Sequence, residues 1–157
     1  LLKYFQKVSP KKFIFEACLV EYGMTGEFYQ QQIEFCKKYE IPLTTLKTET
    51  FDVVKNKIKP DSSFCSFFSR MRRGHLVNFA KNNGFNKLAL GHHLDDIAES
   101  FLMNSFYNGM IRSMPPKYKT ESGLEIIRPM VFVREKNLAK FAQQNKFPTI
   151  GDEMCPG

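Results

Sequence analysis

The sequence predicts an α/β protein built on a parallel β-sheet. Short apolar runs of strand length alternate with longer segments of helical periodicity along the chain. Strands separated by helices favour parallel pairing through right-handed crossovers. The 157 residues, 43% of them hydrophobic and 14% aromatic, suffice for one packed domain, which we expect to span residues 1–157.

Helices and strands alternate in the first half of the chain. Pro10 and Pro42 end the first two helices, because proline lacks the backbone N–H that a continuing helix needs. Gly84 follows the last helix of this half, where glycine is common. The expected elements are a helix at 1–8, a strand at 13–20, a helix at 28–39, a strand at 43–48, a short helix at 51–58 and a helix at 66–81.

The second half predicts two further strands, at 87–90 and 124–127, and two helices, at 95–107 and 134–144. A polar loop containing two adjacent prolines is expected between them, at 108–123, and its length is typical of a functional segment. In the helix at 95–107, apolar and small residues recur at helical spacing and predict a buried stripe. The stripe consists of Ile97, Phe101, Leu102 and Ser105.

Residues 86–99 indicate a function most directly. An apolar run at 88–90 meets Gly91, and a helix start with two histidines and two aspartates follows, the layout of a strand that delivers polar groups to the carboxyl edge of a sheet. Helix amides at such an edge favour phosphate oxygens, and Asp95 and Asp96 can hold a hard cation that accompanies polyphosphate. The alternative is an acidic first turn favoured by the helix dipole, with histidines that only pack.

The net charge of +7 predicts a polyanionic partner. Arg70, Arg72 and Arg73 are close together, and guanidinium groups suit phosphodiesters. Further basic residues follow the acidic helix start, among them Lys117, Lys119, Arg128, Arg134 and Lys136. The alternative is a solvated basic surface, which explains the lysines better than it explains the three arginines.

The cysteines and the hydropathy pattern indicate a reducing compartment. Four cysteines lack the regular spacing of a disulfide framework, so free thiols or ligands are expected. No apolar run approaches the roughly 18 residues that span a bilayer, and no secretion leader is visible. We therefore expect a cytoplasmic protein with no membrane partner.

Several groups of residues occur in a fixed order from residue 65 to residue 136: Cys65-Ser66-Phe67-Phe68-Ser69-Arg70-Met71-Arg72-Arg73-Gly74, Leu90-Gly91-His92-His93-Leu94-Asp95-Asp96, Asn104 to Gly109 with Met114-Pro115-Pro116-Lys117, Ile127-Arg128-Pro129, and Arg134-Glu135-Lys136. Together they resemble the tRNA 2-thiocytidine synthetase family of PP-loop ATPases. Any one motif is weak, but all of them in register make chance similarity improbable.

The resemblance implies a Rossmann-like fold of the adenine nucleotide alpha hydrolase type, with helices on both faces of its parallel sheet. It implies an enzyme that uses ATP and Mg²⁺ to adenylate a tRNA base, most simply a cytidine, and then replaces the base oxygen with sulfur. The implied nucleotide-binding residues are Gly91, His92, Asp95 and Asp96, with Asp95 in the metal or catalytic role. The implied tRNA contacts are Arg70, Arg72, Arg73, Lys117 and Arg128.

One departure concerns the phosphate-binding loop of the family, which begins Ser-Gly-Gly-Lys-Asp-Ser after the first strand. No such motif occurs in this sequence. A sheet without its first strand would expose two long unpaired edges. We therefore expect the natural protein to carry that strand and loop ahead of Leu1, so that the domain at 1–157 is incomplete at its N-terminus.

A second departure concerns sulfur chemistry. The family holds a [4Fe-4S] cluster through Cys-x-x-Cys and a distant third cysteine. Here Cys65 and Cys155 match the first and last ligands, but Phe68 replaces the second, and phenylalanine cannot ligate iron. We expect no cluster. Instead, Cys65 and Cys155 would lie close together and act as a catalytic pair, one carrying a persulfide and the other resolving it as a disulfide.

Three functions remain open at this stage. The first is an ATP-dependent tRNA-thiolating enzyme that takes sulfur from a donor protein or from sulfide, and a homodimer would suit its grip on tRNA. The second is another PP-loop adenylating ligase or amidating enzyme. The third is a degenerate nucleotide-binding or RNA-binding protein without thiolation activity.

Overall fold

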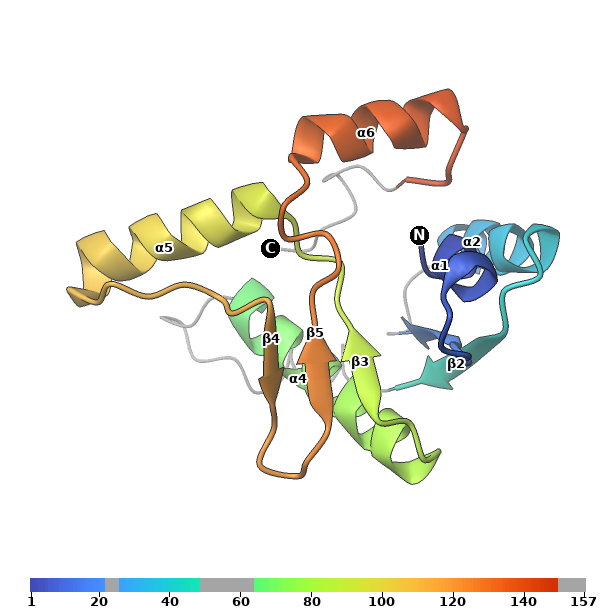
Figure 1. Cartoon of the computed structure of the whole chain (residues 1–157), viewed down its shortest axis with the longest axis horizontal. Helices are drawn as coiled ribbons and strands as arrows, with labels where there is room; N and C mark the ends of the chain where they lie inside the picture. The colour runs from blue at the N-terminus through green and yellow to red at the C-terminus, as the bar shows by residue number, and fades with distance from the viewer. Residues whose placement is uncertain (22–25, 49–63, 150–157) are drawn as a thin grey trace. The chain divides into compact units, whose positions relative to one another are not determined.

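The computed structural model describes residues 1–21, 26–48 and 64–149, and of residues 26–28 and 64–67 it describes the backbone only (Figure 1). The chain divides into two compact units, one formed by Leu1–His75 with Pro148–Gly157 and the other by Leu76–Phe147. The short helix expected at 51–58 lies outside the described residues. A single domain over residues 1–157 stays a prediction.

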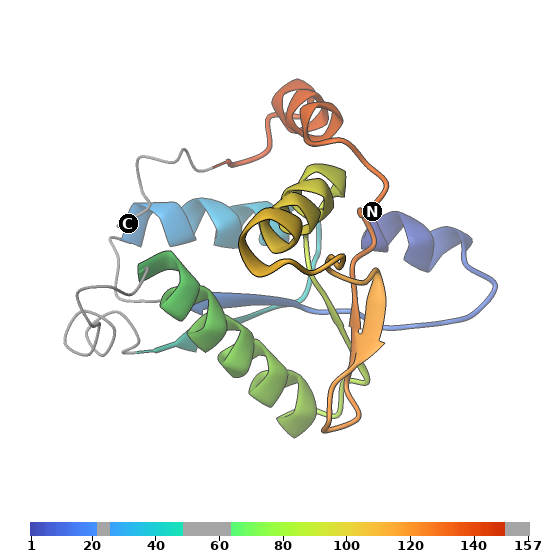
Figure 2. The ribbon, with the colours of Figure 1, turned by 90° about the vertical axis from the view of Figure 1, so that its left-hand side faces the viewer.

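The first unit contains α1 (Leu2–Val8), β1 (Ala17–Glu21), α2 (Gly26–Lys38), β2 (Leu43–Lys47) and the start of α4 (Phe64–Asn82). Strands β1 and β2 pair in parallel, with Ala17 opposite Leu43. Both helices, α1 and α2, lie on the same side of this pair (Figures 1 and 2). Each element was expected from the sequence, although β1 begins four residues later than predicted, where the Ala17 amide donates to the Pro42 carbonyl.

The second unit holds the rest of α4, then β3 (Lys87–Ala89), α5 (Leu94–Asn108), β4 (Lys117–Lys119), β5 (Glu125–Ile127) and α6 (Glu135–Gln144). Strand β5 lies between the other two strands, parallel to β3 and antiparallel to β4. The expectation of a loop throughout 108–123 was therefore wrong, and the pairing is not parallel throughout. Lys117–Lys119 alternates polar and apolar residues before a turn that closes at Gly123 (φ +84°), so a hairpin forms.

The core of the second unit centres on β5. Ile126 is fully buried (0% exposed) and packs with Leu124 and with Ala80 of α4. Leu88 of β3 and Tyr118 of β4 pack against this cluster from the flanking strands. The C-terminal part of α4 thus covers one face of the three-stranded sheet.

A buried carboxylate ties the three strands together. Glu125 of β5 accepts hydrogen bonds from Lys87 of β3 and, at 2.9 Å, from Lys117 of β4. These two ammonium groups hold the pKa of Glu125 below its ordinary value, against the opposing effect of desolvation. The buried charge is therefore paired from both neighbouring strands.

The buried stripe expected on α5 was wrong. Phe101 and Leu102 are both exposed, as are Met103 and Phe106 after them. Helix α5 starts beyond the carboxyl end of β3 and does not lie along the core face of the sheet, and none of its residues is fully buried. In the described part of the chain, every helix is too short or too polar to cross a membrane.

We predict that Ile126→Ala lowers the free energy of unfolding by about 2–5 kcal/mol, because the substitution leaves a cavity at the centre of the core. Chemical denaturation monitored by circular dichroism measures the loss. Ile111→Ala makes the same substitution at a residue that is 89% exposed, and we expect it to change stability by less than about 0.5 kcal/mol. Equal losses in the two variants would contradict the position of the core.

Candidate nucleotide-binding site at the start of two helices

The two segments that leave β3 and β5 run side by side to the starts of α5 and α6 (Figure 1). The Leu90 amide donates to the Ile127 carbonyl at 2.9 Å, His93 and Met130 form a parallel bridge, and the Leu94 amide donates to the Val133 carbonyl at 3.0 Å. Both helices therefore begin at the carboxyl edge of the parallel pair, as the sequence predicted for α5. In α/β sheets this edge is where ligands bind.

Helix α5 closes its own first turn. The amide of His93, the N-cap residue, donates to Asp96 Oδ2 at 2.7 Å, and His93 Nδ1 accepts from the Asp96 amide at 3.4 Å. This reciprocal arrangement satisfies amides that a helix start otherwise leaves open. Asp96, predicted to bind nucleotide, thus uses one of its carboxylate oxygens to hold the helix start.

Asp95 joins α5 to α6. Its Oδ1 accepts from Arg134 Nε at 2.9 Å, and its Oδ2 accepts from the Glu135 amide at 2.7 Å. Glu135 is the first residue of α6, and the preceding Arg134 gives that helix no side-chain cap. Asp95 therefore supplies the cap from a neighbouring helix, where a negative charge also interacts favourably with the helix dipole.

The same contacts set the ionisation of Asp95. The hydrogen bond from the Glu135 amide is the largest influence lowering its pKa, and the positive charge of Arg134 and its hydrogen bond act in the same direction against desolvation. Asp95 is thus held as a carboxylate. This state suits either a structural acceptor or a ligand for a hard cation.

Gly91 and His92 lie between β3 and these helix starts. Gly91 is exposed, and a Cβ added there would meet only Met130 Cε, at 3.8 Å, which is ordinary contact. The packing of the protein therefore does not require glycine at this position. Its backbone is open to the close approach of a ligand. His92 is partly buried beside it.

The predicted tRNA contacts fall in both units. Arg70, Arg72 and Arg73 are exposed on the part of α4 that belongs to the first unit. In the second unit, Lys117 is engaged by Glu125, and Arg128 is only 5% exposed. The side chain of Arg128 therefore does not project from the surface.

The side chains of the two predicted catalytic cysteines both lie outside the described part of the structure. Cys155 lies outside the described residues, and Cys65 is placed in α4 by its backbone only. The described thiols, Cys18 and Cys36, are free. Burial, with a smaller contribution from Glu16, raises the pKa of Cys18 to about 11, and burial also raises the pKa of Cys36. Without a bound metal, both thiols therefore ionise less readily than an exposed cysteine.

Among the described side chains, which are those of residues 1–21, 29–48 and 68–149, no group of three or more His, Cys, Asp or Glu is arranged so that it could hold a metal ion by itself. Mg²⁺ commonly binds through one or two carboxylates and substrate phosphates. Asp95 and Asp96 can contribute only through oxygen lone pairs that their structural hydrogen bonds leave open.

Sequence reasoning missed Arg134 as the partner of Asp95 and His93 as a helix cap. The capping signal was present, since His93 and Asp96 have the spacing of a capping box with histidine in the place of serine. The Asp95–Arg134 pair left no signal, because its members are 39 residues apart.

A protein-family comparison decides the class of the chain. The sequence model of the family described as PP-loop domain matches residues 1–154 of this chain. This chain belongs to the PP-loop family. The match confirms the fold class that the sequence predicted.

Curated relatives of this PP-loop domain are bacterial proteins named tRNA-cytidine(32) 2-sulfurtransferase. The protein of Pseudomonas paraeruginosa is 37% identical over 156 residues, which is 99% of this chain and 57% of the relative. Those of Coxiella burnetii and Legionella pneumophila are 42% and 45% identical, over 74% and 73% of this chain and 46% and 41% of the relatives. The chain thus spans about half the length of the curated relatives it matches.

Among solved structures, the PP-loop domain resembles a protein described as U34-tRNA thiolase NcsA from Methanococcus maripaludis with its [4Fe-4S] cluster. The TM-score is 0.72, the sequence identity is 22%, and the match covers 95% of this chain and 51% of that one. This likeness confirms the fold.

We predict that Asp95 stabilises the PP-loop domain in a pH-dependent manner. Because the folded-state pKa lies below the unfolded value, the stabilisation is complete above the unfolded pKa of about 4 and is lost as the pH falls through the folded pKa. In Asp95→Asn, the side-chain oxygen still accepts from the Glu135 amide, but the charge is lost. The difference in unfolding free energy between wild type and Asp95→Asn should therefore be largest at neutral pH and shrink below about pH 4.

Glu121→Gln, which removes one negative charge from the exposed turn between β4 and β5, is the matched control. Denaturant titrations between pH 3 and pH 7 measure both variants. A difference for Asp95→Asn that stays constant across this range would contradict the role of the carboxylate.

Proposed function

We propose that this chain forms the nucleotide-binding part of an ATP-dependent enzyme that thiolates tRNA, with a cytidine as the modified base. The observation that carries the proposal is the similarity of 99% of the chain to a tRNA-cytidine(32) 2-sulfurtransferase at 37% identity. The open backbone at Gly91, beside two helix starts, supports an ATP site at the same edge. The described geometry is thus compatible with the reaction that the relatives are named for.

In the proposed reaction, the base carbonyl oxygen attacks the α-phosphate of ATP and pyrophosphate leaves. The oxygen then departs with AMP when sulfur attacks the same carbon. Negative charge builds up on phosphate oxygens in the first step and must be neutralised. Mg²⁺ bound with ATP would supply part of this neutralisation. Gly91 and His92 are proposed to line the nucleotide, and Asp95 and Asp96 to fix the two helix starts and to offer their remaining lone pairs to the metal.

Sulfur delivery is proposed to use Cys65 and Cys155 without an iron–sulfur cluster. The donor set does not fit a cluster held by three thiolates, because Phe68 stands at the second ligand position of the Cys-x-x-Cys pattern. Cys18 lies in β1 and Cys36 in α2, so neither stands in that pattern with Cys65. A persulfide on one cysteine would transfer its outer sulfur to the activated base carbon. The second cysteine would then release the product by forming a disulfide, which an external dithiol reduces.

The tRNA is proposed to contact the exposed arginines of α4, which are Arg70, Arg72 and Arg73, and the basic residues Lys117 and Arg128 of the second unit. Sulfur would come from a donor protein that itself carries a persulfide; if sulfide is the source, it would attack the activated base carbon directly, with AMP leaving and no cysteine persulfide formed. A cytoplasmic location and a homodimer complete the proposal, since both suit an enzyme that acts on tRNA.

The proposal predicts that the full-length gene product restores 2-thiocytidine to the tRNA of a bacterium deleted for its own tRNA-cytidine(32) 2-sulfurtransferase. Mass spectrometry of digested tRNA measures the nucleoside. Cys65→Ser and Cys155→Ser should each abolish restoration, because each removes one member of the sulfur relay. Cys36→Ser removes a thiol that is protonated and outside the relay, and it should leave restoration intact.

An unchanged nucleoside profile with the wild-type gene would overturn this function. Pyrophosphate release that requires a small acceptor in place of tRNA would then identify an adenylating ligase. Binding of tRNA without binding of ATP would identify a degenerate RNA-binding protein.

The exposed arginines of α4 give a further prediction. Replacing Arg72 and Arg73 together with glutamine should weaken tRNA binding and reduce the slope of log K against log salt by about 0.7–0.9 for each lost phosphate contact. Filter binding between 50 and 300 mM salt measures the slope. The double variant Lys136→Gln with Lys140→Gln on exposed positions of α6 removes the same charge and should leave the slope nearly unchanged. Equal effects of the two double variants would indicate general electrostatic attraction and no arginine contact.

A further inference from the structure

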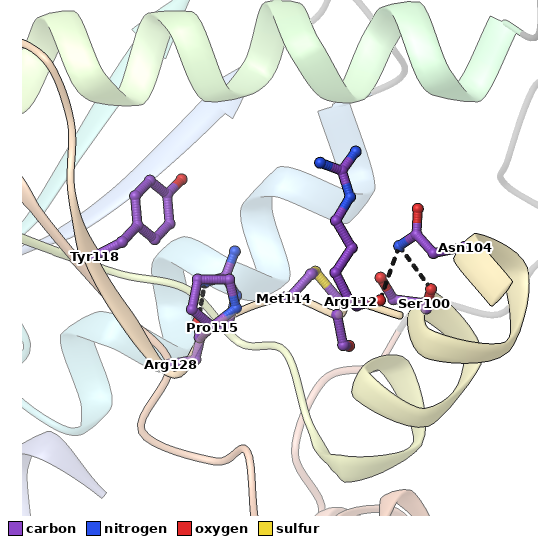
Figure 3. Close-up of a pocket in the computed structure, with 8 residues that line it drawn as sticks. Ser100, Asn104, Arg112, Met114, Pro115, Tyr118 and Arg128 are labelled. Atoms are coloured by element: carbon purple, nitrogen blue, oxygen red, sulfur yellow. Dashed lines mark hydrogen bonds between the residues drawn. The ribbon is translucent and has the colours of Figure 1, made fainter. Parts of the chain in front are cut away.

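A surface pocket of about 450 Å³ lies in the second unit, farther along α5 than the proposed ATP edge (Figure 3). Ser100 and Asn104 of α5 form one wall, Arg112 and Pro115 belong to the segment before β4, and Arg128 follows β5. In Figure 3, Tyr118 and Arg112 stand on either side of Pro115. This volume falls within the range of ligand pockets in proteins.

The wall at 112–113 is fixed to α5 by hydrogen bonds. Asn104 Nδ2 donates to the Ser100 carbonyl at 2.8 Å and to the Arg112 carbonyl at 3.2 Å (Figure 3). Ser113 Oγ donates to the Ile97 carbonyl at 2.6 Å. Because these bonds hold the backbone of the segment, the side chain of Arg112 starts from a defined position. The pocket is therefore formed before any ligand binds, which lowers the entropic cost of binding.

Arg128 is held rigidly at the pocket. Its Nη1 donates to the Pro115 carbonyl at 2.5 Å, its amide donates to the Pro116 carbonyl at 2.9 Å, and its guanidinium carbon lies 5.4 Å from the centre of the Tyr118 ring. Its Nε is buried and has no hydrogen-bond acceptor among the described residues. A buried N–H without an acceptor is unfavourable, so Arg128 offers a donor that a ligand oxygen can satisfy.

The chemistry of the lining selects an anion with a flat apolar part. Two guanidinium groups, Arg112 and Arg128, line the pocket, and no carboxylate does. Arginine matches the geometry of phosphate oxygens. The ring of Tyr118 and the faces of Met114 and Pro115 provide apolar surface beside these charges. A phosphate joined to a planar base fits this combination, and unpaired RNA bases commonly stack on aromatic side chains.

We propose that this pocket binds one unpaired nucleotide of an RNA strand, with its phosphate at Arg112 and Arg128 and its base at Tyr118. This inference rests on the proposed RNA substrate. Ser100 and Asn104 follow Asp95 along α5 by about 7 and 14 Å at 1.5 Å per residue. The bound nucleotide is therefore a near neighbour of the base that reacts at the ATP edge, and the pocket places the RNA strand for that reaction.

The test measures binding of the full-length protein to three RNA probes by fluorescence anisotropy. The probes are an anticodon stem-loop, a single-stranded oligonucleotide of the same loop sequence, and a duplex without unpaired bases. Arg112→Gln and Tyr118→Leu should each weaken binding of the first two probes by about fivefold to tenfold, because a phosphate contact or a stacking contact is lost. Binding of the duplex should change no more in Arg112→Gln than in the control Lys119→Gln, and no more in Tyr118→Leu than in the control Tyr118→Phe.

Two controls separate contact from charge and from folding. Lys119→Gln removes one positive charge from an exposed position of β4 outside the pocket. Tyr118→Phe keeps the ring and should retain wild-type binding, which also shows that a fall in Tyr118→Leu comes from the lost ring. Melting curves compare the folding of all variants.

The possible outcomes distinguish failure of the pocket proposal from failure of the proposed RNA substrate. If the wild type binds the stem-loop and Arg112→Gln weakens binding no more than Lys119→Gln does, the pocket proposal is overturned while the proposed function stands. If the pocket variants weaken duplex binding and single-strand binding equally, the pocket proposal is likewise overturned and the proposed function stands. If the wild type binds none of the three probes, both the pocket proposal and the proposed RNA substrate are overturned.

Discussion

The start of α6 in the second unit depends on the bonds that Asp95 makes to it. Two strands deliver two helices to the same edge, but the parallel pairing alone does not fix how the second helix begins. Asp95 fixes it by accepting from both the side chain of Arg134 and the amide of Glu135. Because that amide would otherwise lack an intrahelical partner, one carboxylate satisfies a helix end and balances a charge at once.

This constraint changes how the acidic pair of the motif is understood. Paired aspartates at a sheet edge suggest metal binding when only the sequence is considered, yet in the structure Asp96 accepts from the His93 amide and Asp95 from α6. Both carboxylates therefore shape the edge before any ligand arrives. A nucleotide at Gly91 would meet a preorganised surface, which is the condition under which electrostatic stabilisation of a reacting phosphate is most effective.

Local signals in the sequence predicted most elements of the fold, and contacts between distant residues escaped them. Strand β3, Gly91 and the start of α5 could be read from one continuous stretch, because apolar run, turn and acidic first turn are adjacent there. The hairpin partner β4 was missed because its three residues are few and lie in a mostly polar segment, directly after two adjacent prolines. Burial of Glu125 and Arg128 could not be foreseen, because each is tolerated only through partners brought by other elements.

The position of β5 at the centre of its sheet implies an order of assembly. Its contact with β4 is local, since a short turn at Gly123 joins the two strands, whereas Lys87 of β3 and Glu125 of β5 are 38 residues apart in sequence. Closing a long loop costs more conformational entropy than closing a short hairpin, and the long-range pairing therefore forms more slowly. The β4–β5 hairpin should therefore form early and act as a template on which β3 docks, and the crossover containing α5 becomes ordered only when that late pairing closes.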